Sequence, residues 1–420
     1  MRILIHGINF APELTGIGKY TGEMARWLAR EGHEVRVVTA PPYYPDWRIG
    51  NDYSAVRYLR QAYPSGCGEM TMYRCPLWVP ASPSGGKRLV HLASFAASSL
   101  PVMLAQVRWR PDLVLVIAPT LFCAPMAALV ARVAGAKSWL HIQDFEVDAA
   151  FGLGMLQSTQ ARRWFLGAES QLLRRFDRVS TISDRMMDRL ADKGVPTSRR
   201  VLFRNWTDTK AIYPLAAPSG FRDELDIADD SRVVLYAGNL GEKQGLDVLI
   251  DAARRTACDE SIIWVIAGAG SARVKLEARS VDLPNVRWLP LQPMEKLNEL
   301  LNLADIHVLP QRADAADLVM PSKLTGMLAS GRPVVATAAE GTQVASIVSE
   351  CGICVPPEDA DALAKALSEL ADDGKRRYAL GAKARHYAER HLGYEQIMRN
   401  FEFEAEALVN GAADTVEDDA

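Results

Sequence analysis

The chain has 420 residues, of which 49% are hydrophobic and 24% charged, and its formal net charge is −3. This length exceeds the usual size of one hydrophobic core, so we expect two domains. The composition is typical of a globular protein, and the charge gives no reason to expect a nucleic-acid partner. Six scattered cysteines suggest no disulfide framework, which predicts a reducing, cytoplasmic compartment.

One uncharged stretch, Leu113–Ala131, approaches the ~20 residues that a membrane-spanning helix needs. Pro119 and Pro125 interrupt this stretch, and Leu113–Ile117 alone has the pattern of a buried parallel strand. We therefore predict a strand, a turn and a helix here instead of a membrane span. The N-terminal apolar run is short, so no secretory signal is expected.

The N-terminal half alternates apolar runs with helical periodicity. Arg2–His6 predicts a strand, and the helix after it has Tyr20, Met24 and Trp27 on one face. Strand-helix-strand units of this kind imply parallel strands joined by right-handed crossovers. Further strands are predicted at residues 33–39, 113–117, 138–142 and 178–182.

A second alternating series follows a segment rich in proline and polar residues. This segment, 206–220, is the expected linker between domain 1–205 and domain 221–391. Strands are predicted in the second domain at residues 233–237, 262–267, 286–289, 306–309 and 333–336. A final helix at about 392–409 is expected to pack back on the first domain, followed by an acidic tail, 410–420. The fold class is therefore α/β, with two doubly wound domains facing a central cleft, where ligands lie at the carboxyl ends of the strands.

Two glycine-rich turns are candidates for binding an anion. Gly16 and Gly18 lie between a strand and a helix, where glycine permits close backbone approach and the helix presents free N–H groups. Gly238–Gly245 combines three glycines, Asn239 and Lys243 between a strand and a helix, which suits a diphosphate. An ordinary turn with a surface lysine is the alternative.

A second lysine loop, Met320–Lys323, precedes another helix. Pro321 suits the first turn of that helix, and Ser322 and Lys323 stand at its entrance, where N–H groups, a hydroxyl and an ammonium could hold a diphosphate. An ordinary capped helix would explain the proline and serine but leave the lysine unexplained.

Two further motifs follow strand ends. Gly268 and Gly270 form half of a dinucleotide fingerprint, but the third glycine is missing, so a nucleotide contact is expected without a nicotinamide site. His141 and Asp144 end a strand of the first domain, where they could meet a sugar or share a proton. A structural histidine is the alternative for His141.

Acidic pairs and a Cys-x-x-Cys motif could suggest metal binding. We interpret Asp314, Asp317 and the pair Asp359 and Asp361 as solvated faces or helix caps, and therefore expect no metal. Cys351–Cys354 has no second cysteine pair or histidine pair nearby, which favours two packed cysteines.

Together these motifs resemble glycosyltransferase family 4, retaining enzymes of the GT-B fold with two Rossmann-like domains. The resemblance covers nearly the whole chain and is carried by an ordered set of segments: Gly16–Gly18, Gly32–Val35, Val201–Asn205 with Asp208, Gly238–Gly245, Ile266–Gly270 and Ala329–Val335.

The resemblance implies transfer of a sugar from a nucleoside-diphosphate donor to a lipid-linked or saccharide acceptor in exopolysaccharide biosynthesis. It implies no metal or other cofactor, and a cytoplasmic enzyme that is peripheral on the inner membrane. His141, Asp144, Lys243 and Lys323 are the implied catalytic residues. The implied donor-binding residues are Gly16, Gly18, Gly238, Asn239, Lys243, Gly268, Gly270, Asp317, Ser322 and Lys323.

The sequence departs from the family at two glutamates that normally flank the second lysine loop. Their positions fall on Leu318 and Gly326, and Asp317 is a candidate replacement for the first glutamate. Two alternatives therefore stay open: a nucleotide-sugar epimerase of the same architecture, and a non-catalytic nucleotide-sugar-binding assembly protein.

Two basic, apolar segments of the first domain, 86–95 and 161–176, are candidates for contact with an anionic membrane surface. Packing of Trp164, Phe165, Leu172 and Phe176 into the domain is the alternative for the second segment.

Overall fold

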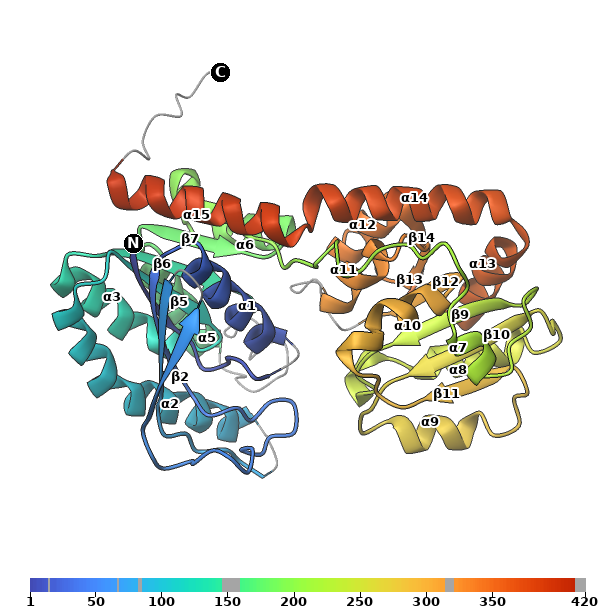
Figure 1. Ribbon diagram of the computed structural model, residues 1–420, viewed down its shortest axis with the longest axis horizontal. Coiled ribbons are helices and arrows are strands. Elements are labelled where there is room, and N and C mark those ends of the chain that lie inside the picture. The colour runs from blue at the N-terminus through green and yellow to red at the C-terminus, as the bar shows by residue number, and fades with distance from the viewer. Residues whose placement is uncertain (14–15, 66–67, 82–84, 146–158, 314–320, 412–420) are drawn as a thin grey trace, which may run out of the picture. The chain divides into compact units, whose positions relative to one another are not determined.

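The computed structural model describes the chain except for residues 14–15, 66–67, 82–84, 146–158, 314–320 and 412–420 (Figure 1). The chain forms two compact units: unit 1 is Met1–Arg204 with Met398–Ala420, and unit 2 is Asn205–Ile397. The expected linker, 206–220, groups with unit 2, because the backbone N–H groups of Tyr213 and Leu215 donate to the side-chain amide oxygens of Asn298 and Asn302.

Unit 1 contains an eight-stranded sheet in the order β3-β4-β2-β1-β5-β6-β7-β8. Only the β3–β4 pair is antiparallel among the described strands. All of β5 is buried, as expected for a parallel sheet covered on both faces. The strands are β1 (Arg2–His6), β2 (Glu34–Thr39), β3 (Leu59–Ser65), β4 (Gly68–Arg74), β5 (Leu113–Ala118), β6 (Lys137–Ile142), β7 (Arg178–Thr181) and β8 (Arg200–Leu202).

The helices of unit 1 cover both faces of this sheet. Right-handed crossovers place α2 and α3 on one face, where they pack side by side, and α1 on the other. Tyr20, Met24 and Trp27 of α1 are buried, as predicted. The helices are α1 (Gly16–Arg30), α2 (Gly85–Gln106), α3 (Ala124–Ala134), α5 (Thr159–Leu173), α6 (Asp184–Asp192) and α15 (Tyr394–Asn410).

The C-terminal part of α15 belongs to unit 1 although it is distant in sequence. Phe401 stacks on Phe203 with ring centroids 4.7 Å apart, and its ring lies 4.9 Å from that of Trp139 on β6. Burial of these aromatic side chains contributes to holding the helix on the sheet.

Unit 2 contains a six-stranded parallel sheet in the order β11-β10-β9-β12-β13-β14. Its strands are β9 (Arg232–Ala237), β10 (Ile262–Ala267), β11 (Val286–Leu289), β12 (Ile306–Pro310), β13 (Val334–Thr337) and β14 (Gly352–Val355). Its helices are α7 (Phe221–Glu224), α8 (Asp247–Arg255), α9 (Arg273–Arg279), α10 (Leu297–Leu303), α11 (Ser322–Ala329), α12 (Gln343–Cys351), α13 (Ala360–Asp372) and α14 (Gly374–His391).

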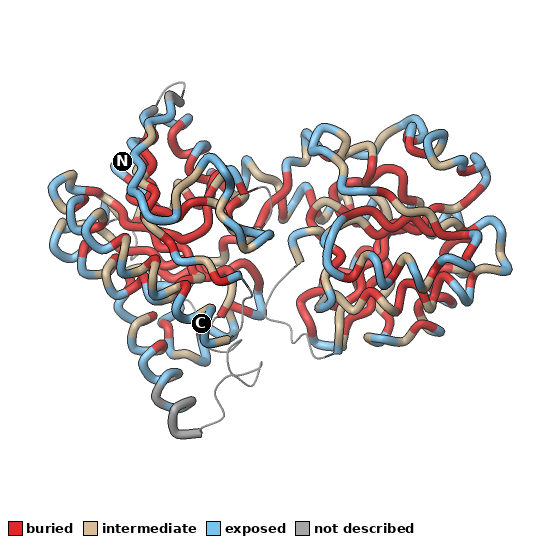
Figure 2. The backbone as a smooth tube through the Cα atoms, turned by 90° about the horizontal axis from the view of Figure 1, so that it is seen from below, coloured by how far each residue is buried: buried red, intermediate tan, exposed pale blue. Residues whose placement is uncertain are grey.

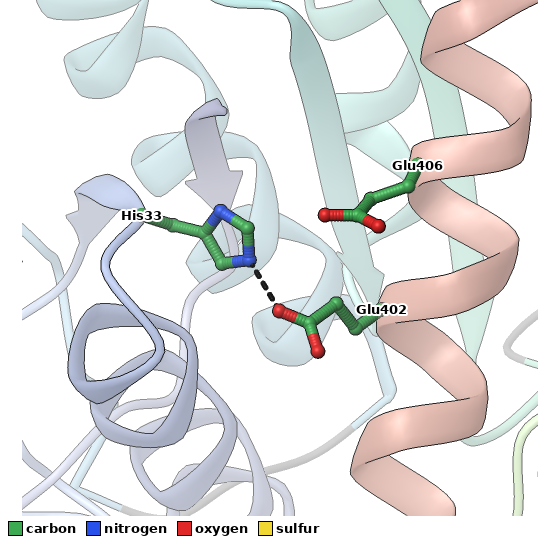
Figure 3. Close-up of side chains that lie close together, drawn as sticks. All are labelled: His33, Glu402 and Glu406. Atoms are coloured by element: carbon green, nitrogen blue, oxygen red, sulfur yellow. Dashed lines mark hydrogen bonds and ion pairs between the residues drawn. The ribbon is translucent and has the colours of Figure 1, made fainter.

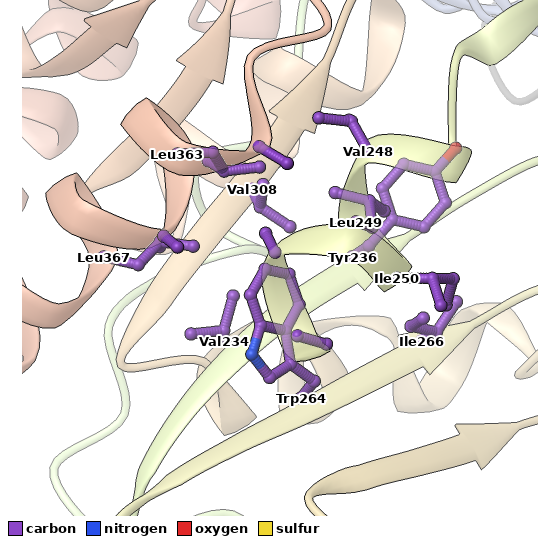
Figure 4. Close-up of a cluster of buried hydrophobic side chains, with 14 of the residues drawn as sticks. Val234, Tyr236, Val248, Leu249, Ile250, Trp264, Ile266, Val308, Leu363 and Leu367 are labelled. Carbon is purple, nitrogen blue, oxygen red and sulfur yellow. The ribbon is translucent and has the colours of Figure 1, made fainter. Parts of the chain in front are cut away.

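The core of unit 2 forms where β9 and β10 meet α8 and α13 (Figure 4). Trp264 is fully buried there, and its indole N–H donates to Thr256 Oγ1 at 2.9 Å, so its one polar atom is paired. Figure 2 shows the same arrangement in the backbone, with buried strands inside each unit and exposed residues outside. This packing fixes the strand ends that carry the loops described below.

The structure confirms the predicted strands, each within one residue at either end. Strand β5 and helix α3 replace the rejected span at residues 113–131. Cys351 and Cys354 each contact a backbone carbonyl and are free thiols, which confirms that they are packed cysteines. Strands β3, β4, β8 and β14 were not predicted.

Candidate active site

In unit 2, Lys323 lies at the carboxyl end of β9. It occupies the first turn of α11, and its ammonium donates to Tyr236 Oη at 2.5 Å and to Gln244 Oε1 at 3.3 Å. The ammonium also lies 4.5 Å from the centre of the Tyr236 ring. Tyr236 is itself fixed, because its hydroxyl donates to the carbonyl of Asn239 at 2.7 Å.

The charge of Lys323 has no carboxylate partner among the described residues. Burial lowers the pKa of this lysine to about 8. An ammonium has three donors, and two of them have partners among the described residues. A half-buried cation with no carboxylate partner in the described part of the chain is suited to receive an anion.

Gly238 provides the space in which Lys323 lies. A Cβ at position 238 would stand 3.2 to 3.3 Å from Cε, Cδ and Nζ of the lysine, and the residue has φ of +154°. A side chain here would therefore press on Lys323 as well as strain the backbone. Gly238 was predicted to contact a donor. In the structure it also makes room for Lys323, the cation proposed to bind that donor.

Gly268 and Gly270 lie against the same loop. A Cβ at Gly268 would overlap the carbonyl of Gly238, and one at Gly270 would overlap that of Leu240. Hydrogen bonds join the two loops, from Leu240 N to Ala269 O and from Ala272 N to Leu240 O. The close packing of the two backbones is therefore sufficient to explain why positions 268 and 270 are glycines. Their contacts with a donor stay predictions.

The remaining predicted donor residues lie near this edge or outside the described residues. Ser322 and Asn239 are exposed. Lys243 lies in a 3-10 turn, Glu242–Gln244, but its side chain is outside the described part of the chain, as is all of Asp317. The donor roles of these four residues stay predictions.

Position 326 explains one departure from the family. A Cβ at Gly326 would point at Leu301 Cδ1, 3.2 Å away, and at Ile212 Cδ1, 3.8 Å away. The Cβ of a glutamate at this position would contact apolar side chains where α11 packs against α10. The carboxylate expected there from the family pattern has no equivalent at position 326.

In unit 1 the glycines Gly16 and Gly18 start α1, and a buried carboxylate explains one of them. Gly18 packs on Glu13, whose Cβ would lie 2.7 Å from a Cβ at position 18. Glu13 accepts hydrogen bonds from Asn9 Nδ2 at 3.0 Å and from the backbone N–H groups of Tyr43 and Tyr44.

Burial raises the pKa of Glu13, although these hydrogen bonds and the charge of Arg74 oppose the shift. The sequence analysis missed this residue. In the sequence, the only sign of a role for Glu13 is its position between Pro12 and the glycine turn at Gly16. Because the described hydrogen bonds satisfy both carboxylate oxygens, Glu13 serves to hold the loop in place.

His141 lies near the end of β6 (Lys137–Ile142), and Asp144 lies just after this strand, as predicted. His141 is 2% exposed, and its Nδ1 lies 2.9 Å from Ser180 Oγ on β7. Burial lowers its pKa to about 3, so the imidazole is neutral near pH 7. His6 and His307 have the same lowered pKa and a serine partner, which indicates a structural role that all three can share. Asp144 is half-buried.

Unit 1 also has an apolar pocket beside α2, with a volume of about 600 Å³. Trp47 and Trp78 line it together with aliphatic side chains, and Ser94 and Ser98 face it from α2. Trp47 has φ of +52°, an uncommon conformation for a bulky residue, and its ring packs 5.2 Å from that of His91. Strain of this kind is often retained where a side chain has a binding role.

One group in unit 1 has the residue types of a metal site: His33, Glu402 and Glu406 (Figure 3). His33 Nε2 lies 2.7 Å from Glu402 Oε1, and Nδ1 lies 3.1 Å from the N-terminal amine of Met1. Both ring nitrogens therefore have protein partners already. The arrangement acts as a link between the N-terminus, the turn before β2 and α15, and the absence of a metal requirement stays a prediction.

The other acidic candidates have structural roles where they are described. Asp359 caps α13 by accepting from Ala362 N at 2.9 Å, and Asp361 pairs with Arg255. These contacts confirm the interpretation of this pair. Asp314 lies outside the described residues.

Both halves of the chain match known families. Residues 15–206 match the family described as "Glycosyl transferase 4-like domain", and residues 220–387 match "Glycosyl transferases group 1". The chain is 44% identical over 411 residues to the colanic acid biosynthesis glycosyl transferase WcaI of Escherichia coli K12, covering 96% of this chain and 98% of WcaI.

Solved structures share the fold at low sequence identity. Sucrose-phosphate synthase from Thermosynechococcus elongatus has a TM-score of 0.73 at 19% identity, covering 98% of this chain and all of the other. HepE of Anabaena, solved with UDP and glucose, has a TM-score of 0.68 at 16% identity, covering 97% of this chain and all of the other. WaaG, a glycosyltransferase of lipopolysaccharide biosynthesis, has a TM-score of 0.63 at 16% identity, covering 99% and 100%.

These proteins are transferases or synthases, so neither an epimerase nor a non-catalytic assembly protein is favoured. Both family matches and the long alignment agree with the order of motifs in the sequence. The chain belongs to glycosyltransferase family 4 and is a glycosyltransferase of the GT-B fold.

Proposed function

We propose that this glycosyltransferase moves a sugar, with retention, from a nucleoside-diphosphate donor to a lipid-linked saccharide in the assembly of a colanic-acid-like exopolysaccharide. The observation that carries the proposal is the half-buried ammonium of Lys323 beside Gly238, which has no carboxylate partner among the residues that the structure describes. The resemblance to WcaI over almost the full length of both proteins supports the pathway, and the UDP complexes of HepE support the class of donor.

The chemistry requires charge stabilisation on the leaving diphosphate. When the sugar's anomeric carbon separates from the phosphate oxygen, negative charge grows on the β-phosphate, and Lys323 offers it a positive charge and an N–H donor. The acceptor hydroxyl then attacks from the same face, and its proton passes to the leaving phosphate. The contribution of the protein is positioning and electrostatic stabilisation.

Lys243, Ser322 and Asn239 are proposed as further contacts of the diphosphate, and Asp317 as a contact of the donor sugar. His141 and Asp144 are proposed to shape the sugar site without donating a proton, because the pKa of His141 leaves it neutral. No metal ion is required in this proposal, because the lysines supply the positive charge.

For the acceptor we propose the apolar pocket of unit 1. Its two tryptophans and its aliphatic lining suit the sugar faces and the first hydrocarbon units of a lipid-linked saccharide. Exposed Arg48 also lines this pocket and could contact an acceptor phosphate. A lipid-linked acceptor requires an enzyme that works peripherally on the inner membrane.

A thermal-shift screen of UDP-, GDP- and ADP-sugars tests the donor assignment. A donor at a hundred times its dissociation constant should add about 2.7 kcal/mol of stability. The shift should be lost in Lys323→Ala, and Trp78→Ala should retain it while losing transfer to a lipid-linked acceptor. Absence of a shift with every nucleotide sugar would contradict the proposal.

A further inference from the structure

Helix α2 is built with its apolar side facing outward. Among the described residues, Gly85–Trp109 is one helix that is long and apolar enough to cross a membrane by length and composition. Its buried stripe is nevertheless rich in polar residues: His91, Phe95, Ser99, Met103 and Gln106. A helix of a globular domain normally shows the opposite distribution.

The buried polar residues attach α2 to unit 1. Ser99 Oγ lies 3.0 Å from His6 Nε2 on β1, and Gln106 Oε1 accepts from Arg36 on β2 at 2.9 Å. His91 Nδ1 lies 2.7 Å from the carbonyl oxygen of Trp78. A helix held by polar contacts with two strands of the sheet and with the loop after β4 forms part of the domain, so its apolar outer side cannot be explained as a membrane span.

Helix α3 packs beside α2 and also carries exposed apolar side chains. Leu89, Val90, Leu100 and Leu104 are exposed on α2, and the residues between them on this side are alanines and a proline. On α3 and the turn before it, the exposed residues include Phe122, Leu129 and Val133. We name this surface the α2–α3 face. Exposed apolar side chains on two helices that pack side by side are typical of a docking site.

Charge at the edges of this face favours one partner. Residues 85–135 contain one acidic residue, Asp112, which accepts from the backbone of Arg2, and five basic residues: Lys87, Arg88, Arg108, Arg110 and Arg132. Lys87 and Arg88 lie in the first turn of α2, Arg108 and Arg110 follow this helix, and Arg132 lies on α3. Self-association through identical faces would bring these cations together, whereas an anionic lipid surface would neutralise them.

We propose that the α2–α3 face docks on an anionic lipid bilayer, with its leucines and valines in the interface and its arginines and lysines at the head groups. The inference deepens the proposed function, on which it rests, since a lipid-linked acceptor is reached at such a surface. The pocket proposed for the acceptor borders α2 through Ser94 and Ser98, so docking would bring its mouth near the lipid.

Of the two segments that the sequence suggested for membrane contact, the structure favours 86–95 over 161–176. In segment 161–176, Phe176 is fully buried and Phe165 is 38% exposed, and Glu169 is buried with Lys193. The C-terminal part of this segment, which includes Glu169 and Phe176, therefore belongs to the core of unit 1. Segment 86–95 contributes only the first turns of a longer face.

Co-sedimentation of the full chain with vesicles tests this inference. Wild type should bind vesicles of phosphatidylethanolamine and phosphatidylglycerol at low salt, and bind pure phosphatidylcholine vesicles weakly. Leu100→Gln/Leu104→Gln should weaken vesicle binding by on the order of tenfold per leucine, because each side chain loses its burial in lipid. The matched control Val274→Gln/Val281→Gln changes two exposed valines of unit 2 and should bind as wild type does.

The outcomes separate this inference from the proposed function. Equal vesicle binding by the leucine variant and wild type, or no binding by wild type at low salt, overturns the docking face. The docking face is also overturned if light scattering shows that wild type is a dimer and the leucine variant is a monomer. The face would then be an interface between two copies of the chain. The leucine variant should retain the donor-induced thermal shift, and a missing shift in both proteins together with vesicle binding would refute the donor proposal alone.

Discussion

The carboxyl ends of the two sheets carry different ionisable groups, although both units are built from the same strand-helix repeat. In unit 2 the group beside β9 is the ammonium of Lys323, with two neutral hydrogen-bond partners. In unit 1 the loop after β1 holds the carboxyl of Glu13, and β6 ends in the neutral imidazole of His141.

This difference supports the proposal that the donor diphosphate binds to unit 2. A diphosphate approaching unit 2 meets a cation that has no carboxylate partner among the described residues, whereas one approaching the β1 end of unit 1 meets a buried carboxyl group. The doubly wound fold supplies the position of the site in both units, but the side chains at the strand ends determine its chemistry. The following predictions test this contrast, beginning with the largest expected effect.

Lys323→Ala should reduce turnover about 100-fold, because one charge-assisted hydrogen bond that strengthens in the transition state contributes ~2–3 kcal/mol. The melting temperature should change little, since the half-buried lysine has only neutral hydrogen-bond partners among the described residues. Steady-state kinetics and calorimetry measure the two effects.

The matched control for this prediction is Lys365→Ala in the same unit. Lys365 is an exposed lysine of α13 that lies 4.0 Å from Glu369. It should leave both turnover and melting unchanged. Turnover of Lys323→Ala close to that of wild type would remove Lys323 from the proposed mechanism.

Gly238→Ala should weaken donor binding about tenfold, because the new Cβ presses on the Lys323 side chain while the backbone is strained. Gly341→Ala is the control, since Gly341 also has positive φ, +84°, but no atom within 4 Å of its Cβ position. Both variants should lose stability, and only Gly238→Ala should lose donor affinity by titration calorimetry. Equal donor affinity in the two variants would contradict the proposed contact.

Donor affinity should fall as pH rises through about 8. The pKa of Lys323 in the free protein is about 8, and an anionic donor binds the protonated form. The protonated fraction then falls about tenfold between pH 7 and pH 9, and the affinity falls with it. Lys323→Arg keeps its charge over this range, so the pH dependence of its donor affinity should be flat. A sloping profile in this variant would assign the effect to another group.

The sequence predicted the alternation of strands and helices well because buried parallel strands are continuous apolar runs. It missed β3 and β4, whose hairpin mixes charged and apolar residues, and the short strands β8 and β14. Lys323 could be predicted because it stands at a helix entrance after a proline. Tyr236 and Glu13 could not, because their roles depend on contacts between segments far apart in the chain.

The smallest effect is expected from removal of metal ions: exhaustive chelation should change neither turnover nor melting temperature. Turnover should persist because Lys323 supplies positive charge to the leaving diphosphate. Melting should be unchanged because the His33 ring is held by the N-terminal amine and Glu402.

Glu402→Gln provides the contrast: by weakening a charge-assisted hydrogen bond it should lower stability by about 1 kcal/mol while turnover stays normal. Turnover that returns only with added magnesium or manganese would show that the diphosphate needs a metal. A melting temperature that a chelator lowers in wild type but not in Glu402→Gln would instead place an ion at His33, Glu402 and Glu406.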